Sequence, residues 1–220
     1  MINKIFAVVF IILLFPAFVI ISFILFLQSG QFPLFIQERG LSLKKWRFKI
    51  YKFRTLTNRN SLIKNSSPNL LRLGHGVYVS RFGKFLRKTG LDEMPQLINI
   101  LKGEMNFVGP RPLDLRDLKN IKNEFPVLYS EKEKTDLKPG LTGYWQVYKD
   151  DERSIGNLIE LDKYYSENKT FLLDLNLILK SFLISFSGKH KDAIEELSPG
   201  LENEVHINKP SSVYRRQLIF

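Results

Sequence analysis

The sequence predicts a helix-rich α+β domain that an N-terminal apolar segment holds at a membrane. Three observations lead to this fold class. Residues 5–27 form an uncharged apolar run, IFAVVFIILLFPAFVIISFILFL, that is long enough to span a bilayer. Residues 46–55 (WRFKIYKFRT) alternate apolar and basic side chains, which is the period of a strand with one apolar and one cationic face. Helical spacing of apolar residues dominates the second half of the 220-residue chain, whose length suits one domain with appendages.

Two features of the apolar run argue against an ordinary transmembrane helix. Pro16 lies at its middle, where it removes a backbone hydrogen bond and clashes with the preceding turn. Lys4 precedes the run and the basic cluster 39–54 follows it, so the positive-inside rule places both ends on the cytoplasmic side. A helix–break–helix hairpin with legs of ~11 residues would enter the bilayer by roughly 16 Å, about one leaflet. A straight transmembrane helix remains the alternative, since such helices tolerate proline.

The remaining elements follow from turn residues and apolar spacing. Residues 28–33 (QSGQFP) and 58–76 are rich in turn-forming or polar residues and predict loops. A compact helix is predicted to begin near Asp92 and to stop at Gly103, with Pro95 tolerated only near its first turn. The other predicted elements are a basic amphipathic helix at 79–88, a charged helix at 114–134 interrupted near Pro126, a turn and short strand within 138–147, helices at 158–165 and 171–186, and a polar tail at 189–220.

The charge distribution indicates an anionic partner. The net charge is +11, and residues 1–90 contain 15 basic residues against 1 acidic residue. This surplus suits nucleic acid, anionic lipid or a phosphorylated substrate. The chain has no cysteine, which excludes disulfides and thiolate chemistry, and its three histidines share no metal-ligand spacing, so a zinc site is not expected.

Asp92 and Glu93 form a carboxylate pair directly after this basic region. The positive end of the predicted helix favours an ionised Asp92, and an ionised carboxylate can attack a phosphoryl group to form an acyl phosphate. Glu93 is better suited to bind Mg²⁺, which typically takes one or two carboxylates together with substrate phosphates. The alternative is that Asp92 is an N-cap and Glu93 a first-turn charge.

The segment Gly109-Pro110-Arg111-Pro112 adds weight to a phosphate site. Two prolines bracket one arginine and restrict the backbone on both sides of it. A pre-organised guanidinium binds phosphate through two hydrogen bonds at a lower entropy cost. Alone, however, such a segment is usually only a turn.

Five blocks in order resemble the bacterial sugar transferases, the monotopic phosphoglycosyl transferases that initiate lipid-linked glycan assembly. The resemblance covers about residues 3–188. The length of the chain is similar to that of the minimal, single-domain form of the family. The blocks are KFRT (52–55), RFGKFLRKTGLDEMPQLINILKGEMNFVGPRP (81–112), KPGLTGYWQV (138–147), ELDKYY (160–165) and LDLNLILK (173–180).

The resemblance implies transfer of a sugar 1-phosphate from a UDP-sugar to polyprenol (undecaprenyl) phosphate, with release of UMP. It assigns the nucleophile to Asp92, forming an aspartyl phospho-sugar, and Mg²⁺ binding to Glu93. It matches Arg111 to the family's phosphate-binding arginine. It matches Arg54, Arg87 and Asp162 to further positions needed for activity. We expect these three residues and Lys52 to bind substrate or phosphate.

The resemblance also implies a location and a domain division. The expected site is the cytoplasmic face of the bacterial inner membrane, in contact with lipid, with downstream glycosyltransferases as further partners and no nucleic acid. A re-entrant helix at 1–37, a catalytic domain at 38–188 and the tail at 189–220 are expected. The family breaks its re-entrant helix at Ser-Pro, whereas this chain has Phe15-Pro16 and lacks that hydroxyl.

Two rival functions remain from the residues themselves. A membrane-tethered basic adaptor that binds anionic lipid or nucleic acid through residues 39–90 would explain the charge. It assigns no special role to the carboxylate pair or to Arg111. A phosphatase, which would lose its acyl phosphate to water, could use the same carboxylates.

Overall fold

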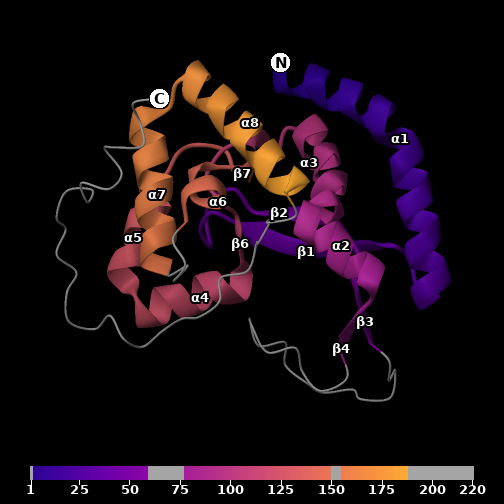
Figure 1. Ribbon diagram of the computed structural model, residues 1–220. Coiled ribbons are helices and arrows are strands. Elements are labelled where there is room, and N and C mark those ends of the chain that lie inside the picture. The colour runs from indigo at the N-terminus through magenta and orange to yellow at the C-terminus, as the bar shows by residue number, and fades with distance from the viewer. Residues whose placement is uncertain (1, 59–76, 150–154, 188–220) are drawn as a thin grey trace.

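The computed structural model describes residues 2–58, 77–149 and 155–187, and it confirms a helix-rich α+β fold with a long apolar helix at its N-terminus (Figure 1). The predicted tail lies outside the described residues, as does nearly all of the predicted loop at 58–76. In chain order the elements are α1 (Ile2–Ser29), β1 (Leu34–Gly40), β2 (Phe48–Phe53), β3 (Leu56–Asn58), β4 (Val77–Val79), α2 (Arg81–Thr89), the 3₁₀ helix η1 (Leu91–Gln96), α3 (Leu97–Lys102), β5 (Asn106–Val108), β6 (Leu113–Asp114), α4 (Leu115–Glu124), α5 (Pro126–Lys134), β7 (Gly140–Thr142), α6 (Tyr144–Tyr148), α7 (Ile155–Asn168) and α8 (Phe171–Phe186).

The helix α1 continues through Pro16 without interruption, whereas the sequence predicted two separate legs. Figure 1 shows that this helix bends along its length, as expected where a proline removes one hydrogen bond of the ladder. By length and composition it could cross a membrane. One stripe of α1 packs on the rest of the chain, and it consists of Ala7, Ile11, Leu14, Phe18, Ile21 and Leu25.

Both ends of α1 are tied to the folded domain. Near its start, Asn3 Nδ2 donates a hydrogen bond to Asn106 Oδ1 at 2.8 Å. Near its end, the hydroxyl of Ser80, the N-cap of α2, donates to Gln28 Oε1 at 2.8 Å. The opposite face of α1 exposes large apolar side chains, among them Phe6, Ile12, Leu13, Phe15, Ile20, Phe23 and Leu27.

A small antiparallel sheet with the strand order β2-β1-β6 lies inside the helices. The alternating segment 46–55 contains β2, so the predicted strand is confirmed. The other two strands of the sheet, β1 and β6, were not predicted from the sequence, and β1 runs across the expected domain boundary at residue 37. The sheet matters for function because β2 contains Lys52, while β6 begins directly after Pro112.

The parallel strands β5 and β7 pair where two glycine-containing backbone segments pass very close to each other. Gly109 donates its N–H to Thr142 O at 3.0 Å, and Gly140 donates its N–H to Pro110 O at 3.1 Å. A Cβ on Gly109 would lie 2.3 Å from Lys138 O, and a Cβ on Gly143 would lie 2.2 Å from Gly109 O. Only glycine fits this crossing, which explains why KPGLTG and GPRP occur together.

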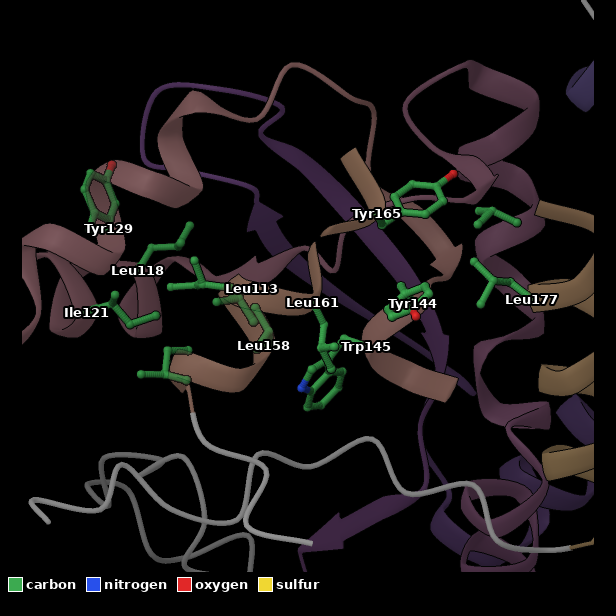
Figure 2. Close-up of a cluster of buried hydrophobic side chains, with 13 residues drawn as sticks. Leu113, Leu118, Ile121, Tyr129, Tyr144, Trp145, Leu158, Leu161, Tyr165 and Leu177 are labelled. Atoms are coloured by element: carbon green, nitrogen blue, oxygen red, sulfur yellow. The ribbon is translucent and has the colours of Figure 1, made fainter. Parts of the chain in front are cut away.

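The largest core cluster lies among α4 to α8, with Trp145 and Tyr165 fully buried within it (Figure 2). The predicted charged helix divides into α4 and α5 at Pro126, which occupies the first turn of α5. Residues 138–147 do contain the predicted strand, but the aromatic residues after it form the short helix α6 and enter the core. Propensity favoured a strand there, and burial of Trp145 against α7 outweighed it.

The helix α8 buries one residue fully, Leu177, and leaves most of its apolar side chains exposed. Phe171 is 79% exposed and Phe186 is 84% exposed. Such a concentration of apolar surface marks a contact with membrane or another macromolecule. The exposed set on α8 is Phe171, Leu172, Leu175, Ile178, Leu179, Phe182, Leu183 and Phe186.

Candidate active site

Asp92 and Glu93 lie in the first turn of η1, directly after the helix α2. The N-cap of η1 is Gly90, whose φ of 69° is in the left-handed region that favours glycine, and it makes no side-chain cap. The N–H of Glu93 donates to Gly90 O at 3.0 Å. Gly90, and not Asp92, is therefore the N-cap of η1, and both carboxylates lie in its first turn.

The two carboxylates have different surroundings. Asp92 is half-buried, whereas Glu93 is only 6% exposed. Lys52 Nζ, from β2, forms an ion pair with Glu93 Oε1. Because both partners are mostly buried, water screens this pair less than it would an exposed one. The pairing of Lys52 with Glu93 joins two residues that are 41 positions apart in the sequence.

A second group of contacts surrounds Arg111, which is also only 6% exposed. Its N–H lies 3.4 and 3.3 Å from the two carboxylate oxygens of Asp162, in α7, to which it donates. Its guanidinium carbon lies 5.1 Å from the ring centre of Trp145. The resemblance assigned Asp162 to the substrate site, but the structure places its carboxylate against the main chain of Arg111, buried from solvent.

Lys132, in α5, completes this group and was missed by the sequence interpretation. Its Nζ donates to Asp162 Oδ2 at 3.0 Å and to the carbonyl of Arg111 at 3.1 Å. Burial raises the pKa of the Asp162 carboxyl above its ordinary value, while the charge of Lys132 and the N–H of Arg111 act against that rise. Among the many lysines of α4 and α5, no sequence signal distinguishes Lys132, because only the fold removes it from water.

The sheet holds these two groups in one framework. Arg39, in β1, pairs in register with Asp114 and donates from Nη1 to Pro112 O at 3.3 Å. Gln37, also in β1, donates to Asp114 Oδ2. The position of the Pro-Arg-Pro segment is therefore set relative to β1, and β1 pairs along its length with β2, which contains Lys52.

Asp117 is a further carboxyl near the Pro-Arg-Pro segment. Burial first, and the charge of Asp114 second, raise the pKa of Asp117 to about 7, against the opposing charges of Arg39, Arg116 and Arg111. This shift lowers the negative charge that the Asp117 carboxyl carries at neutral pH.

Arg54 and Arg87 are the two remaining predicted site residues. Arg54 Nε donates to Phe32 O at 3.0 Å and Arg54 Nη2 to Leu34 O at 3.4 Å, so its guanidinium stabilises the turn after α1. Arg87 is exposed in the last turn of α2, which leads through Gly90 to the carboxylate pair. The contacts of the structure thus join Lys52 to Glu93 and Arg111 to Asp162, and they place Arg54 against the turn after α1.

A family model described as bacterial sugar transferase matches residues 1–188. The chain belongs to the bacterial sugar transferase family. The match includes every element of the structure from α1 to α8, and both groups of site contacts lie within it.

Named relatives of this bacterial sugar transferase support the same assignment. It is 35% identical over 66% of its length to the uncharacterized sugar transferase EpsL of Bacillus subtilis, and 32% identical over 77% to a UDP-galactose-lipid carrier transferase of Erwinia amylovora. It is 31% identical over 83% to a UDP-N-acetylgalactosamine-undecaprenyl-phosphate N-acetylgalactosaminephosphotransferase of Aeromonas hydrophila. The matched regions span 66%, 36% and 42% of these relatives' own lengths.

Proposed function

We propose that this protein transfers a sugar 1-phosphate from a UDP-sugar to undecaprenyl phosphate, the first membrane step in the synthesis of a lipid-linked glycan. The observation that carries the proposal is the carboxylate pair of η1, in which Glu93 is buried and paired with Lys52 while Asp92 is half-buried and does not cap the helix. Family membership and the donors and acceptors in the relatives' names support this choice of reaction.

The reaction proceeds in two displacements. A carboxylate oxygen of Asp92 attacks the phosphorus that bears the sugar, and the bond from that phosphorus to the bridging oxygen breaks, so UMP leaves with that oxygen. A phosphate oxygen of undecaprenyl phosphate then attacks the same phosphorus. The bond to Asp92 breaks, which returns the carboxylate and releases undecaprenyl diphosphate sugar.

Glu93 is proposed to hold Mg²⁺. Within the described residues no three or more acidic, histidine or cysteine side chains cluster to form a protein-only metal site. One or two carboxylates with a phosphorylated substrate match the donor set that Mg²⁺ prefers, so the residues present fit this ion. The ion would supply positive charge beside the substrate phosphates.

The cations around the site would receive the diphosphate. Arg111 is proposed to bind the transferred phosphate, because a guanidinium held by its backbone offers paired N–H donors. Lys52, which forms an ion pair with Glu93, is proposed to contact the same phosphates. Arg87 is exposed at the end of α2 and is proposed to contribute to substrate binding at the entrance to the site.

We propose that α1 is re-entrant and that the protein lies on the cytoplasmic face of the bacterial inner membrane. Hydrogen bonds tie both ends of α1 to the same domain, through Asn106 near its start and Ser80 near its end. A straight span would place those ends ~30 Å apart, on opposite sides of the hydrocarbon core. The exposed apolar faces of α1 and α8 are proposed to contact lipid.

The topology is tested by cysteine labelling, since the chain has no native cysteine. We expect Ile2→Cys, at the start of α1, and Glu124→Cys, at the end of α4, both to resist a membrane-impermeant maleimide in intact cells and both to react after lysis. Replacing Pro16 with leucine should straighten α1 and favour a span, which would expose the cysteine at position 2 to the outside. Labelling of the Ile2→Cys protein in intact cells, with Pro16 present, would contradict the re-entrant arrangement.

The basic adaptor and the phosphatase predict different behaviour from a transferase. Adaptor function does not require a carboxylate after the basic region to be buried and ion-paired, whereas Glu93 is both. A phosphatase has no need of the exposed apolar surfaces of α1 and α8.

Incubation of the purified protein with a panel of radiolabelled UDP-sugars and Mg²⁺, without lipid acceptor, tests the proposed function. For the correct donor we expect UMP release and up to one sugar phosphate bound per protein, removable by hydroxylamine, because acyl phosphates react with strong nucleophiles. Added undecaprenyl phosphate should move the label to the lipid fraction, and steady-state rates should follow ping-pong kinetics. Label that appears in water would favour the phosphatase. Transfer through a ternary complex without an adduct would make Asp92 a general base.

A further inference from the structure

We infer that the buried Lys132–Asp162 ion pair positions the Arg111 main chain, and that Lys132 is a positioning residue for sugar-phosphate transfer. The inference rests on the proposed function, because it assigns the pair a task only through the phosphate-binding role of Arg111.

The contacts of Arg111 show why a special device is needed there. Proline has no N–H, so Arg111 provides the only backbone donor between Pro110 and Pro112. Asp162 accepts that donor with both oxygens, at 3.4 and 3.3 Å. Lys132 donates to the carbonyl of the same residue at 3.1 Å and to Asp162 at 3.0 Å, which closes a three-membered network around one amino acid.

The other carbonyls of the segment are also bound. Pro110 O accepts from Gly140 N–H at 3.1 Å, and Pro112 O accepts from Arg39 at 3.3 Å. All main-chain polar groups from Pro110 to Pro112 therefore have hydrogen-bond partners. Three of these partners are the charged side chains of Arg39, Lys132 and Asp162. Because the backbone is held at each of these residues, the Arg111 side chain, whose guanidinium lies over the Trp145 ring, starts from a fixed Cα position.

Stability alone gives a weak reason for this pair. The side chains of Lys132 and Asp162 are 1% and 3% exposed, and removing both charges from water costs about as much as their attraction returns. Apolar residues of similar volume would often give equal or greater stability. Apolar residues cannot, however, accept from the N–H of Arg111 or donate to its carbonyl. The pair supplies both functions at once.

The test separates positioning from folding by using the double variant Lys132→Met/Asp162→Leu. This variant replaces the pair with apolar side chains of similar size and leaves no unpaired buried charge, but it leaves the N–H and C=O of Arg111 without partners. We therefore expect a folded protein with a lowered melting temperature. We expect kcat for UMP release, measured with the best UDP-sugar of the panel and undecaprenyl phosphate, to fall by about 100-fold because a displacement of ~1 Å in a binding group has that effect. The KM for the UDP-sugar should change less than kcat.

The same double replacement is then made in an Arg111→Ala protein. Because the pair acts through Arg111, no further loss of turnover is expected there, whereas a merely structural role would lower turnover again. Asp162→Asn and Asp162→Leu both remove the charge that faces Lys132, but only Asp162→Asn keeps an oxygen for the Arg111 N–H, so it should keep several times more turnover than Asp162→Leu. This comparison decides the matter if the double variant does not fold.

Three outcomes would overturn the inference: wild-type turnover in the folded double variant, an additional loss on the Arg111→Ala background, or equal turnover of Asp162→Asn and Asp162→Leu. Failure of the proposed function is a different result. It would appear as absence of UMP release by the wild-type protein with every UDP-sugar of the panel.

Discussion

Substitution of Asp92 by asparagine should reduce sugar-phosphate transfer by more than about 1,000-fold, because the amide cannot replace a carboxylate as the attacking group. The covalent adduct formed with labelled UDP-sugar should disappear in the same variant. Asn has nearly the same volume as Asp and keeps a side-chain oxygen as acceptor, so the melting temperature and the membrane fraction should stay close to those of the wild type. The measurements are UMP release, bound label and thermal unfolding in detergent.

Asp136→Asn is the matched control for this variant. Asp136 is exposed and its ion pair with Lys45, at 2.7 Å, lies on the surface, where such pairs contribute little. Its loss should leave both transfer and adduct formation unchanged. Because asparagine can deamidate to aspartate, Asp92→Ala should be measured beside Asp92→Asn. Near-normal UMP release by the alanine variant would eliminate the covalent mechanism.

Substitution of Glu93 by glutamine should reduce turnover by about 100-fold or more, because it weakens binding of the Mg²⁺ that would stabilise charge on the reacting phosphates. Gln keeps the shape of Glu93 but removes its negative charge, so the concentration of Mg²⁺ needed for half-maximal activity should rise. Removing the charge also leaves Lys52 without its carboxylate partner in a mostly buried place, so some loss of melting temperature is expected.

Lys52→Met distinguishes the metal from the ion pair. It breaks the same Lys52–Glu93 contact but keeps the carboxylate. Its turnover should fall, since Lys52 is assigned to the substrate phosphates, while its Mg²⁺ requirement should stay the same or decrease. If Glu93→Gln and Lys52→Met showed the same Mg²⁺ dependence, Glu93 would act through the ion pair alone and not as a metal ligand.

Much of the secondary structure was predictable because it depends on local chemistry. Apolar spacing predicted α2, α3, α7 and α8 to within a few residues. Pro126 begins α5, where proline's missing N–H does no harm, and Gly103 ends α3 with a positive φ that favours glycine. The strands β1, β3, β4, β5 and β6 were missed, because each is short or lacks a clear alternation. β5 and β6 also depend on pairing with strands distant in sequence.

The sequence by itself determined the apolar N-terminal helix, the basic surplus before residue 90, the carboxylate pair and the Pro-Arg-Pro segment, because each of these is written in consecutive residues. The tertiary structure decided which of these groups are paired. It brings Lys52 to Glu93 across β2 and η1, and it encloses Arg111 between Asp162 and Lys132. Those pairings depend on burial, which sets the cost of an unpaired charge, and burial is a property of the folded chain that no single segment contains.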